Sequence, residues 1–165
     1  APGNGTLVSA VHLAVGRMPV VAGKPEVAIF SEARRRFTIE TALYVGDRLD
    51  TDILGATRAG MRSAIVLTGI DGPKQLLAAG EGQRPDMILG DLRELFLPYP
   101  ATTVAKNGTV TVGTATVRLA PDDTTVVIVE PGVGNDLLRA GCQLIWRSGR
   151  AIFAFSVPEA VYSPG

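Results

Sequence analysis

Short apolar segments alternate with helix-forming segments along the first 96 residues of this 165-residue chain. The apolar segments cover residues 19–22, 42–45, 63–67 and 87–89, and they are apolar throughout, without alternating polar positions. Strands that alternate with helices form parallel sheets, and strands covered on both faces are apolar throughout. The pattern therefore predicts an α/β fold in which helices flank a parallel sheet.

The intervening segments carry signals that begin and end helices. We expect helices over residues 4–15, 25–37, 53–60, 73–79 and 92–96. Pro25 and Pro73 suit first helical positions, which need no N–H donor. Gly16 and Gly60 suit the ends of two helices, and Asp91 suits the N-cap of the last. These helices are the expected cover of the sheet.

The pattern changes after Leu97-Pro98-Tyr99-Pro100, which is typical of a linker. We expect a hairpin of residues 109–112 and 116–119, a strand over 125–129, a helix over 133–145 and a last strand over 151–155. Trp146 and Phe153 are expected in the core. The sequence thus predicts two domains, residues 1–97 and a small α+β module over residues 98–165.

Charge and hydropathy exclude several classes of partner. The chain has 16 Lys and Arg against 16 Asp and Glu, without a basic block, so nothing indicates nucleic acid or a membrane surface as a partner. Its longest apolar runs are far too short to span a bilayer. Cys142 is the only cysteine, which excludes an internal disulfide and makes a reducing cytoplasm the simplest location.

The segment after the apolar run 42–45 carries two spaced carboxylates. Asp47 follows that expected strand directly, and Gly46 permits a sharp exit from it. Asp52 lies five residues further, at the start of an expected helix. Ligands bind at the carboxyl ends of parallel strands, where the two acids can converge on Mg²⁺. The alternative for Asp52 is a helix-capping role, and Asp50 is expected to be a solvated loop acid.

Lys24 follows the apolar run 19–22 and stands between Gly23 and Pro25. At the end of a strand it would also lie at the rim of the sheet. A lysine there can neutralise a phosphate as a point charge. The alternative is an ordinary surface lysine.

These segments together resemble a known family. Gly23-Lys24-Pro25, an amphipathic helix and then the run Tyr44-Val45-Gly46-Asp47-Arg48-Leu49-Asp50-Thr51-Asp52-Ile53 are similar to the third and fourth motifs of haloacid dehalogenase (HAD) superfamily phosphatases. The subfamily includes NagD, the phosphoglycolate phosphatases and pyridoxal phosphate phosphatase. The resemblance covers residues 2–96, with residues 1–16 as a helix returning from the cap domain. The tail resembles a C-terminal module of actinobacterial members, some of which act on glycerol phosphates.

The resemblance implies a role for each matching residue. Lys24 would hold the substrate phosphate and steady the nucleophile, Asp47 would bind Mg²⁺ directly, and Asp52 would be the second acid, near the metal and its waters. The implied activity is hydrolysis of a small phosphomonoester, such as a glycerol phosphate or phosphoglycolate, through an aspartyl-phosphate intermediate. Charge neutralisation is the main need of phosphoryl transfer.

The chain departs from the family pattern at its nucleophile. An Asp-x-Asp loop after an apolar strand does not occur before Lys24. We therefore expect the nucleophile and most of the cap to lie in an N-terminal half, without which this chain is inactive and either self-associates or needs that half as its partner. The alternative is a non-catalytic α/β module that binds a ligand or partner.

Overall fold

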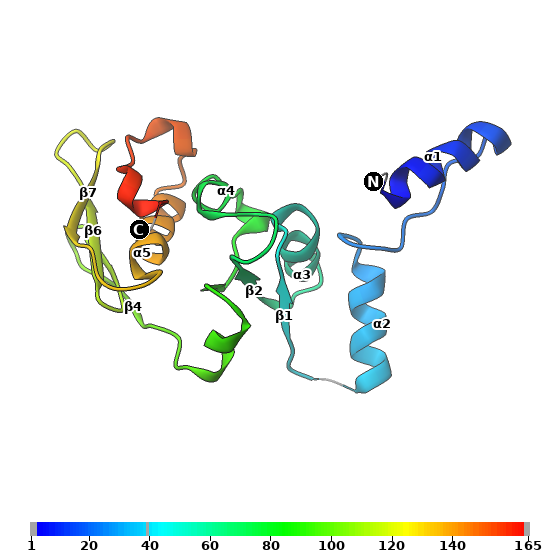
Figure 1. Ribbon diagram of the computed structural model, residues 1–165, viewed down its shortest axis with the longest axis horizontal. Coiled ribbons are helices and arrows are strands. Elements are labelled where there is room, and N and C mark those ends of the chain that lie inside the picture. The colour runs from blue at the N-terminus through cyan, green and yellow to red at the C-terminus, as the bar shows by residue number, and fades with distance from the viewer. Residues whose placement is uncertain (1–2, 39, 164–165) are drawn as a thin grey trace.

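Two sheets form the framework of the molecule in a computed structural model that describes residues 3–38 and 40–163 (Figure 1). The first is parallel, in the order β1 (Leu43–Gly46), β2 (Arg62–Val66) and β3 (Met87–Leu89). The second is antiparallel, in the order β4 (Thr102–Val104), β5 (Val110–Val112), β6 (Ala115–Leu119) and β7 (Val126–Glu130). The predicted α/β class with a parallel sheet and a smaller α+β part is confirmed.

Five α-helices are present among the described residues. They are α1 (Asn4–Val15), α2 (Val27–Phe37), α3 (Leu54–Arg58), α4 (Pro73–Leu77) and α5 (Asp136–Arg147). Short 3₁₀ or π turns cover Leu49–Ile53, Glu81–Gln83, Leu92–Phe96, Ile152–Ala154 and Glu159–Val161. Gly16 ends α1 in the left-handed conformation, with φ 66°, and Asp91 caps its turn as predicted. Over the described ranges, no helix has the length and hydropathy needed to cross a membrane.

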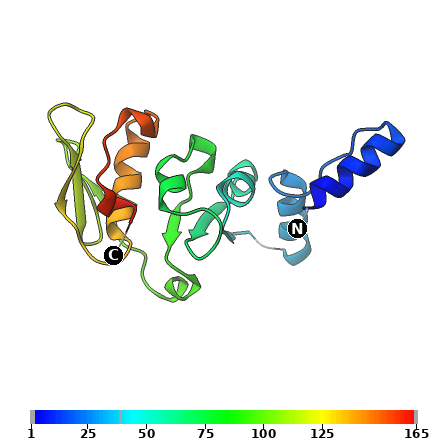
Figure 2. The ribbon, with the colours of Figure 1, turned by 45° about the horizontal axis from the view of Figure 1, so that its top comes forward.

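The strand predicted over residues 19–22 is wrong. Those residues are not in a strand, and Val20 is 97% exposed. A strand needs a neighbour to complete its backbone hydrogen bonds, and no described residue pairs with this segment. Figures 1 and 2 show it leading away from the sheets toward α1, which has no buried residue. Apolar composition alone therefore did not make a strand.

The last predicted strand, residues 151–155, is also wrong. The chain forms a 3₁₀ turn over Ile152–Ala154, and a single bridge joins Thr125 to Ser156. Ile152 and Phe155 pack against the core because residues three apart share one face of such a turn. Phe153 points outward and is 90% exposed, contrary to its predicted place in the core. The short strand β4 was not predicted.

One apolar cluster extends from the first sheet to the second. It contains Ile53, Ile65 and Leu76 from the first part, and Val110, Val117, Leu138, Cys142 and Ile145 from the second. Helix α5 lies between the antiparallel sheet and α4 (Figures 1 and 2). The boundary predicted near residue 97 falls between the sheets, but the division into domains 1–97 and 98–165 stays a prediction because the core runs across it.

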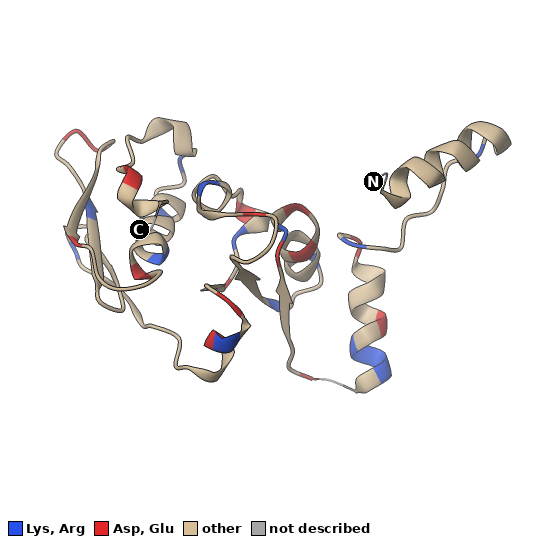
Figure 3. Cartoon of the chain, in the orientation of Figure 1, with Lys and Arg blue, Asp and Glu red and all other residues tan. Residues whose placement is uncertain are grey.

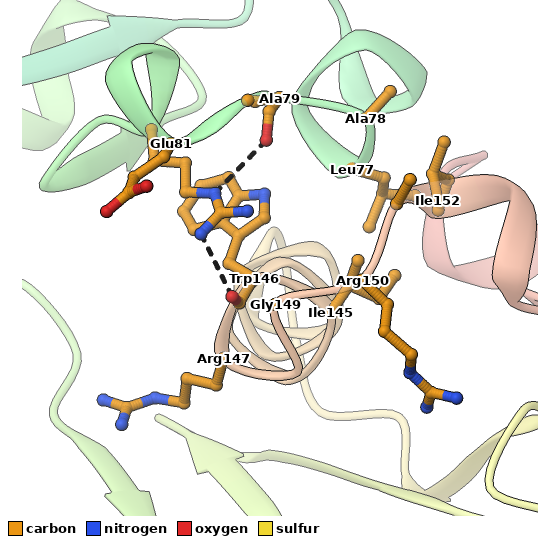
Figure 4. Close-up of a pocket in the computed structure, with 13 residues that line it drawn as sticks. Leu77, Ala78, Ala79, Glu81, Ile145, Trp146, Arg147, Gly149, Arg150 and Ile152 are labelled. Carbon is orange, nitrogen blue, oxygen red and sulfur yellow. Dashed lines mark hydrogen bonds between the residues drawn. The ribbon is translucent and has the colours of Figure 1, made fainter.

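The side chain of Trp146 (Figure 4) and that of Arg84 join the two parts. The indole Nε1 of Trp146 donates to the carbonyl of Leu76 at 3.0 Å, and Trp146 is buried as predicted. Arg84 lies over the indole and donates to the carbonyl of Trp146 at 3.0 Å. A cavity of about 520 Å³ adjoins this contact. The guanidinium groups of Arg147 and Arg150 point away from each other there (Figure 4), so its charged groups do not converge on a ligand.

Candidate active site

The carboxyl ends of β1 and β2 lie side by side, with Gly46 paired to Ile65. Two loops leave the sheet there: the acidic loop, residues 46–52, and the β2 loop, residues 67–72. Acidic residues occur on both loops (red in Figure 3). This edge of a parallel sheet is where ligands bind in α/β proteins. The predicted rim position of Asp47 is therefore the position that it occupies.

Lys24 and Asp52, which are 28 residues apart, meet at this edge. The ammonium Nζ of Lys24 donates to Oδ1 of Asp52 at 2.7 Å. The Asp52 side chain is only 4% exposed, whereas that of Lys24 is 43% exposed. The hydroxyl of Tyr44 donates to the same Oδ1 at 3.2 Å. Lys24 is thus held by Asp52 on one side and exposed on the other, and its role stays a prediction.

The second oxygen of Asp52 holds the acidic loop itself. Oδ2 accepts the backbone N–H groups of Asp47 at 3.2 Å and Arg48 at 3.1 Å. A carboxylate offers about four lone-pair sites, and four donors already approach Asp52. The prediction that Asp52 binds the metal directly therefore finds no free lone pair in this arrangement. The alternative role at a helix N-terminus is compatible with the structure, because Asp52 lies in the first turn of Leu49–Ile53 and accepts the N–H of Arg48, the N-cap residue of that segment.

Proton equilibria favour the charged form of this pair. Burial raises the pKa of Asp52, but the hydrogen bond and charge of Lys24, with the two loop amides, outweigh burial and hold that pKa below its usual range. The hydrogen bond to Asp52 is the main reason that the pKa of Lys24 is raised. Burial raises the pKa of the Tyr44 hydroxyl. An ammonium at Lys24 therefore faces the rim at neutral pH.

Asp47 keeps one carboxylate oxygen free of protein donors. Its Oδ2 accepts the backbone N–H of Ile70 at 3.0 Å, and no donor among the described residues reaches Oδ1. A Cβ on Gly69 would lie 2.1 Å from Cβ of Asp47, and one on Gly46 would lie 2.4 Å from Cβ of Asp52. Glycine at these positions lets the backbone approach both acids. Oδ1 of Asp47 is thus the oxygen available to a cation.

The one carboxylate oxygen available at this edge, Oδ1 of Asp47, is a donor of the type that Mg²⁺ prefers. No group of three or more His, Cys, Asp or Glu side chains that could hold a metal exists within residues 3–38 and 40–163. Mg²⁺ is usually bound by one or two carboxylates, with waters and substrate phosphates completing its octahedron. Asp50 pairs with Arg48 at 2.7 Å and its side chain is 53% exposed, as predicted for a solvated loop acid.

Sequence reasoning missed Tyr44, Gly69 and Asp71 at this site. Asp71 accepts the backbone N–H of Leu49 through its Oδ2 at 2.6 Å. The available signal was position, because Gly69 and Asp71 follow the predicted strand 63–67 as Asp47 follows the strand 42–45. Tyr44 lies within the motif that was recognised, but its contact with Asp52 depends on side-chain direction.

Comparisons with known proteins identify the family that this chain is similar to. Residues 21–95 match the family described as HAD-hydrolase-like. The D-glycerol 3-phosphate phosphatase of Mycobacterium tuberculosis is 37% identical over 158 residues, which cover 91% of this chain and 43% of that protein. Human chronophin is 44% identical over 85 residues, which cover 48% of this chain and 29% of chronophin. This chain therefore spans less than half the length of the curated relatives it matches.

A solved structure extends the likeness to the second sheet. The crystal structure of a glycerol phosphate phosphatase from Mycobacterium tuberculosis in complex with magnesium superimposes with a TM-score of 0.74 and 33% identity. The superposition covers 95% of this chain and 45% of that one. The C-terminal part of this chain is thus shared with the mycobacterial protein, whereas the chronophin match covers only about half of this chain.

Proposed function

Because this chain belongs to the HAD family of hydrolases, we propose that it forms the C-terminal half of a Mg²⁺-dependent phosphomonoester hydrolase. One observation carries the proposal: at the carboxyl edge of a parallel sheet, the buried carboxylate of Asp52 accepts from both the Lys24 ammonium and the backbone N–H of Asp47, and no donor among the described residues reaches Oδ1 of Asp47. A positive charge and a carboxylate that can bind a cation, both tied to Asp52, are the kinds of group that a phosphate needs.

The role proposed for Lys24 is to bind the substrate phosphate. Its ammonium has three N–H donors, of which one goes to Asp52, and its side chain is 43% exposed. Asp52 acts through Lys24, because the ion pair fixes the ammonium and keeps it protonated. Asp52 also holds the amides of Asp47 and Arg48, so one carboxylate orders both the lysine and the acidic loop.

The role proposed for Asp47 is to hold Mg²⁺ through Oδ1. Bound there, Mg²⁺ would neutralise charge on the phosphate during transfer. The Ile70 N–H fixes the other oxygen of Asp47, so the carboxylate is oriented before a cation arrives. The description of the mycobacterial structure as a magnesium complex supports this assignment.

The nucleophile is assigned to an N-terminal half of the enzyme. The proposed reaction is attack by an aspartate on phosphorus, which forms an aspartyl-phosphate and releases the alcohol, followed by hydrolysis of that intermediate by water. Strand β1 is the place for that half to dock, because among the described residues β1 pairs only with β2. The proposed partner is thus a β-strand of the missing half.

The proposed substrate is a small phosphomonoester such as a glycerol phosphate. The 158-residue match to the D-glycerol 3-phosphate phosphatase includes the C-terminal part of this chain. The match to phosphoglycolate phosphatase 2 of Arabidopsis thaliana, at 40% identity, covers 97 residues. Phosphoglycolate is therefore the second candidate within the same class.

The test is phosphate release by this chain combined with the N-terminal half. We expect Mg²⁺-dependent hydrolysis of glycerol phosphate, reduced at least about a hundredfold by Asp47→Asn because a charge-stabilising group at the transferring phosphate is lost. Asp50→Asn is the matched control in the same loop and should stay within about twofold, since its side chain faces solvent. Full activity of Asp47→Asn would refute the role of Asp47.

Lys24→Ala tests the phosphate-binding role separately. We expect a strong loss of turnover, on the order of a hundredfold, because an uncompensated phosphate charge would then face the attacking carboxylate. Lys106→Ala, at an exposed position of the second part, is the control. Binding of phosphomonoesters without any hydrolysis by the combined halves would instead favour the non-catalytic binding module.

A further inference from the structure

The β2 loop is tied to the acidic loop in both directions. The backbone N–H of Ile70 donates to Oδ2 of Asp47 at 3.0 Å, and that of Asp71 donates to the carbonyl of Asp47 at 3.0 Å. In return, the backbone N–H of Leu49 donates to Oδ2 of Asp71 at 2.6 Å. The two loops therefore form one unit around Asp47.

We propose that Asp71 is a positioning residue of this site, which holds the acidic loop in the shape that turns the free oxygen of Asp47 toward a cation. The inference rests on the proposed function, because it assigns Asp47 as the cation ligand. Asp71 does not touch the cation or the substrate in this proposal. It acts through the Leu49 amide, which follows Asp47 by two residues.

Two features argue that the contact is specific to the loop. Leu49 is only 5% exposed and packs in the core, so its amide is a fixed point to which Asp71 can tie the loop. The carboxylate of Asp71 reaches back 22 residues to Leu49, whereas the N-cap of the next helix, α4, is Gly72. Asp71 is therefore not the cap of α4. A charged acceptor at this short distance forms one of the stronger kinds of hydrogen bond.

Removal of the Asp71 carboxylate should make the acidic loop more mobile near Leu49. The Leu49 N–H would lose its hydrogen-bond acceptor, and only the N–H groups of the β2 loop would still bind the turn that carries Asp47. Groups that orient a metal ligand typically change metal affinity about 10–100-fold when they are removed. The alternative role for Asp71 is a negative charge near the cation, which would act without any contact to Leu49.

Mg²⁺ titration of the whole 165-residue chain, followed by the backbone amide resonances of Asp47 and Ile70, separates these roles. Asp71→Asn keeps an oxygen acceptor but removes the charge, and Asp71→Ala removes both. We expect affinity to fall about tenfold or more in Asp71→Ala, and to stay within about threefold in Asp71→Asn. The Leu49 amide should also exchange faster with solvent in Asp71→Ala alone.

Asp86→Ala is the matched control. The carboxylate of Asp86 accepts the backbone N–H of Ser63 at 2.7 Å, the same kind of contact at the opposite end of β2. The Asp86→Ala variant should keep the Mg²⁺ affinity of the wild type, even if its free energy of unfolding is lower. A purely structural role for Asp71 would make the two alanine variants alike.

Four outcomes decide the matter. Equal affinity in Asp71→Ala and wild type, or an equal fall in Asp71→Asn and Asp71→Ala, would overturn the positioning role while leaving the proposed function intact. A wild-type chain that shows saturable Mg²⁺ binding, lost in Asp47→Asn, supports the proposed function independently of Asp71. A wild-type chain without such binding would overturn the cation-binding role of Asp47 in this chain and the positioning role of Asp71 with it, whereas the proposed phosphatase activity is decided by the assay on the combined halves.

Discussion

The two edges of the parallel sheet end in different ways. At the β3 edge, the N–H of Ile88 donates to the hydroxyl oxygen of Tyr99 at 2.9 Å. The carbonyl of Ile88 accepts from Nε of Arg139 at 2.9 Å and from its Nη2 at 2.7 Å. Side chains thus occupy the groups that a fourth strand would use. At the other edge, β1 bonds only to β2 among the described residues.

Arg139 covers the β3 edge as part of a network of side-chain contacts. Its guanidinium pairs with Asp136 at 3.1 Å and with Glu94, and it lies 5.2 Å from the centre of the Tyr99 ring. The Arg139 side chain is only 8% exposed. An edge strand with free amide groups invites pairing, and proteins cover edges that should not pair. The contrast is consistent with a strand of the proposed N-terminal half pairing with β1.

The largest expected effect is that of Arg139→Ala, which would open the closed edge. It leaves Asp136 buried without its cation and the carbonyl of Ile88 without donors. Removing one partner of a buried ion pair typically lowers the free energy of unfolding by about 3–5 kcal/mol. Urea denaturation measures the loss. Arg35→Ala removes an exposed pair with Glu32 and is the control, with little change expected. Equal midpoints for both variants would contradict the importance of the closed edge.

Tyr99→Phe should have the next largest effect, because it removes one hydrogen bond and keeps the ring. The buried N–H of Ile88 would lose its acceptor, which typically lowers the free energy of unfolding by about 1–3 kcal/mol. Hydrogen exchange at the Ile88 amide should become faster, while exchange at β2 changes less. Unchanged exchange at Ile88 would show that water replaces the hydroxyl without loss.

Local composition predicted the strands of the parallel sheet, but it did not predict which apolar segments stay outside the sheet. The segments 42–45 and 87–89 are apolar, bounded by turn signals, and lie within one residue of β1 and β3. The segment 19–22 has the same composition and is not a strand. The segment 19–22 differs from the other two because no described strand pairs with it. Whether a segment finds a pairing strand depends on distant parts of the chain. The hairpin β5–β6 was found because its turn, Gly113-Thr114, is local.

The site was predictable as far as backbone position decides it. Asp47 follows β1 and Asp52 lies in the first turn after it, so local position predicted both. Lys24 does not follow a strand, because residues 19–22 do not form one, and its contact with Asp52 depends on its side chain. The partners of Asp52 and the tie from Asp71 to Leu49 depend on where side chains point across 4 to 28 residues of separation. The contact of Arg139 with Ile88 spans 51 residues, and no local signal marks it.

Leu43→Lys tests the open edge and should have a moderate effect. Leu43 begins β1 and is 37% exposed, and a charge on an edge strand disfavours pairing. We expect binding of the N-terminal half, or self-association of the chain, to weaken about tenfold, which corresponds to about 1.4 kcal/mol. Light scattering and titration of the two halves measure it.

Phe153→Lys is the control for Leu43→Lys. Phe153 is 90% exposed on the second part of the molecule, so this variant also replaces an exposed apolar residue by lysine without touching β1. A general loss of surface hydrophobicity would affect both variants alike. Only a selective effect of Leu43→Lys supports pairing at β1.

The smallest expected effect is that of acid on the stability contributed by the ion pair between Lys24 and Asp52. The pKa of Asp52 is lower in the folded chain than its ordinary value of 3.8, because Lys24 and the loop amides outweigh burial. As pH falls below 3.8, the unfolded chain therefore takes up a proton at Asp52 before the folded chain does. The free energy of unfolding should then decrease with falling pH, by at most about 1.4 kcal/mol per pH unit for one proton.

The Asp52→Asn variant tests this effect because it has no carboxyl group to take up that proton. Its free energy of unfolding, measured by urea denaturation at each pH between 5 and 2, should fall less steeply than that of wild type. The other carboxylates contribute equally to both proteins. Parallel profiles for the two proteins would show that Asp52 titrates alike in the folded and unfolded chains, and that the pair with Lys24 does not hold its charge as the geometry requires.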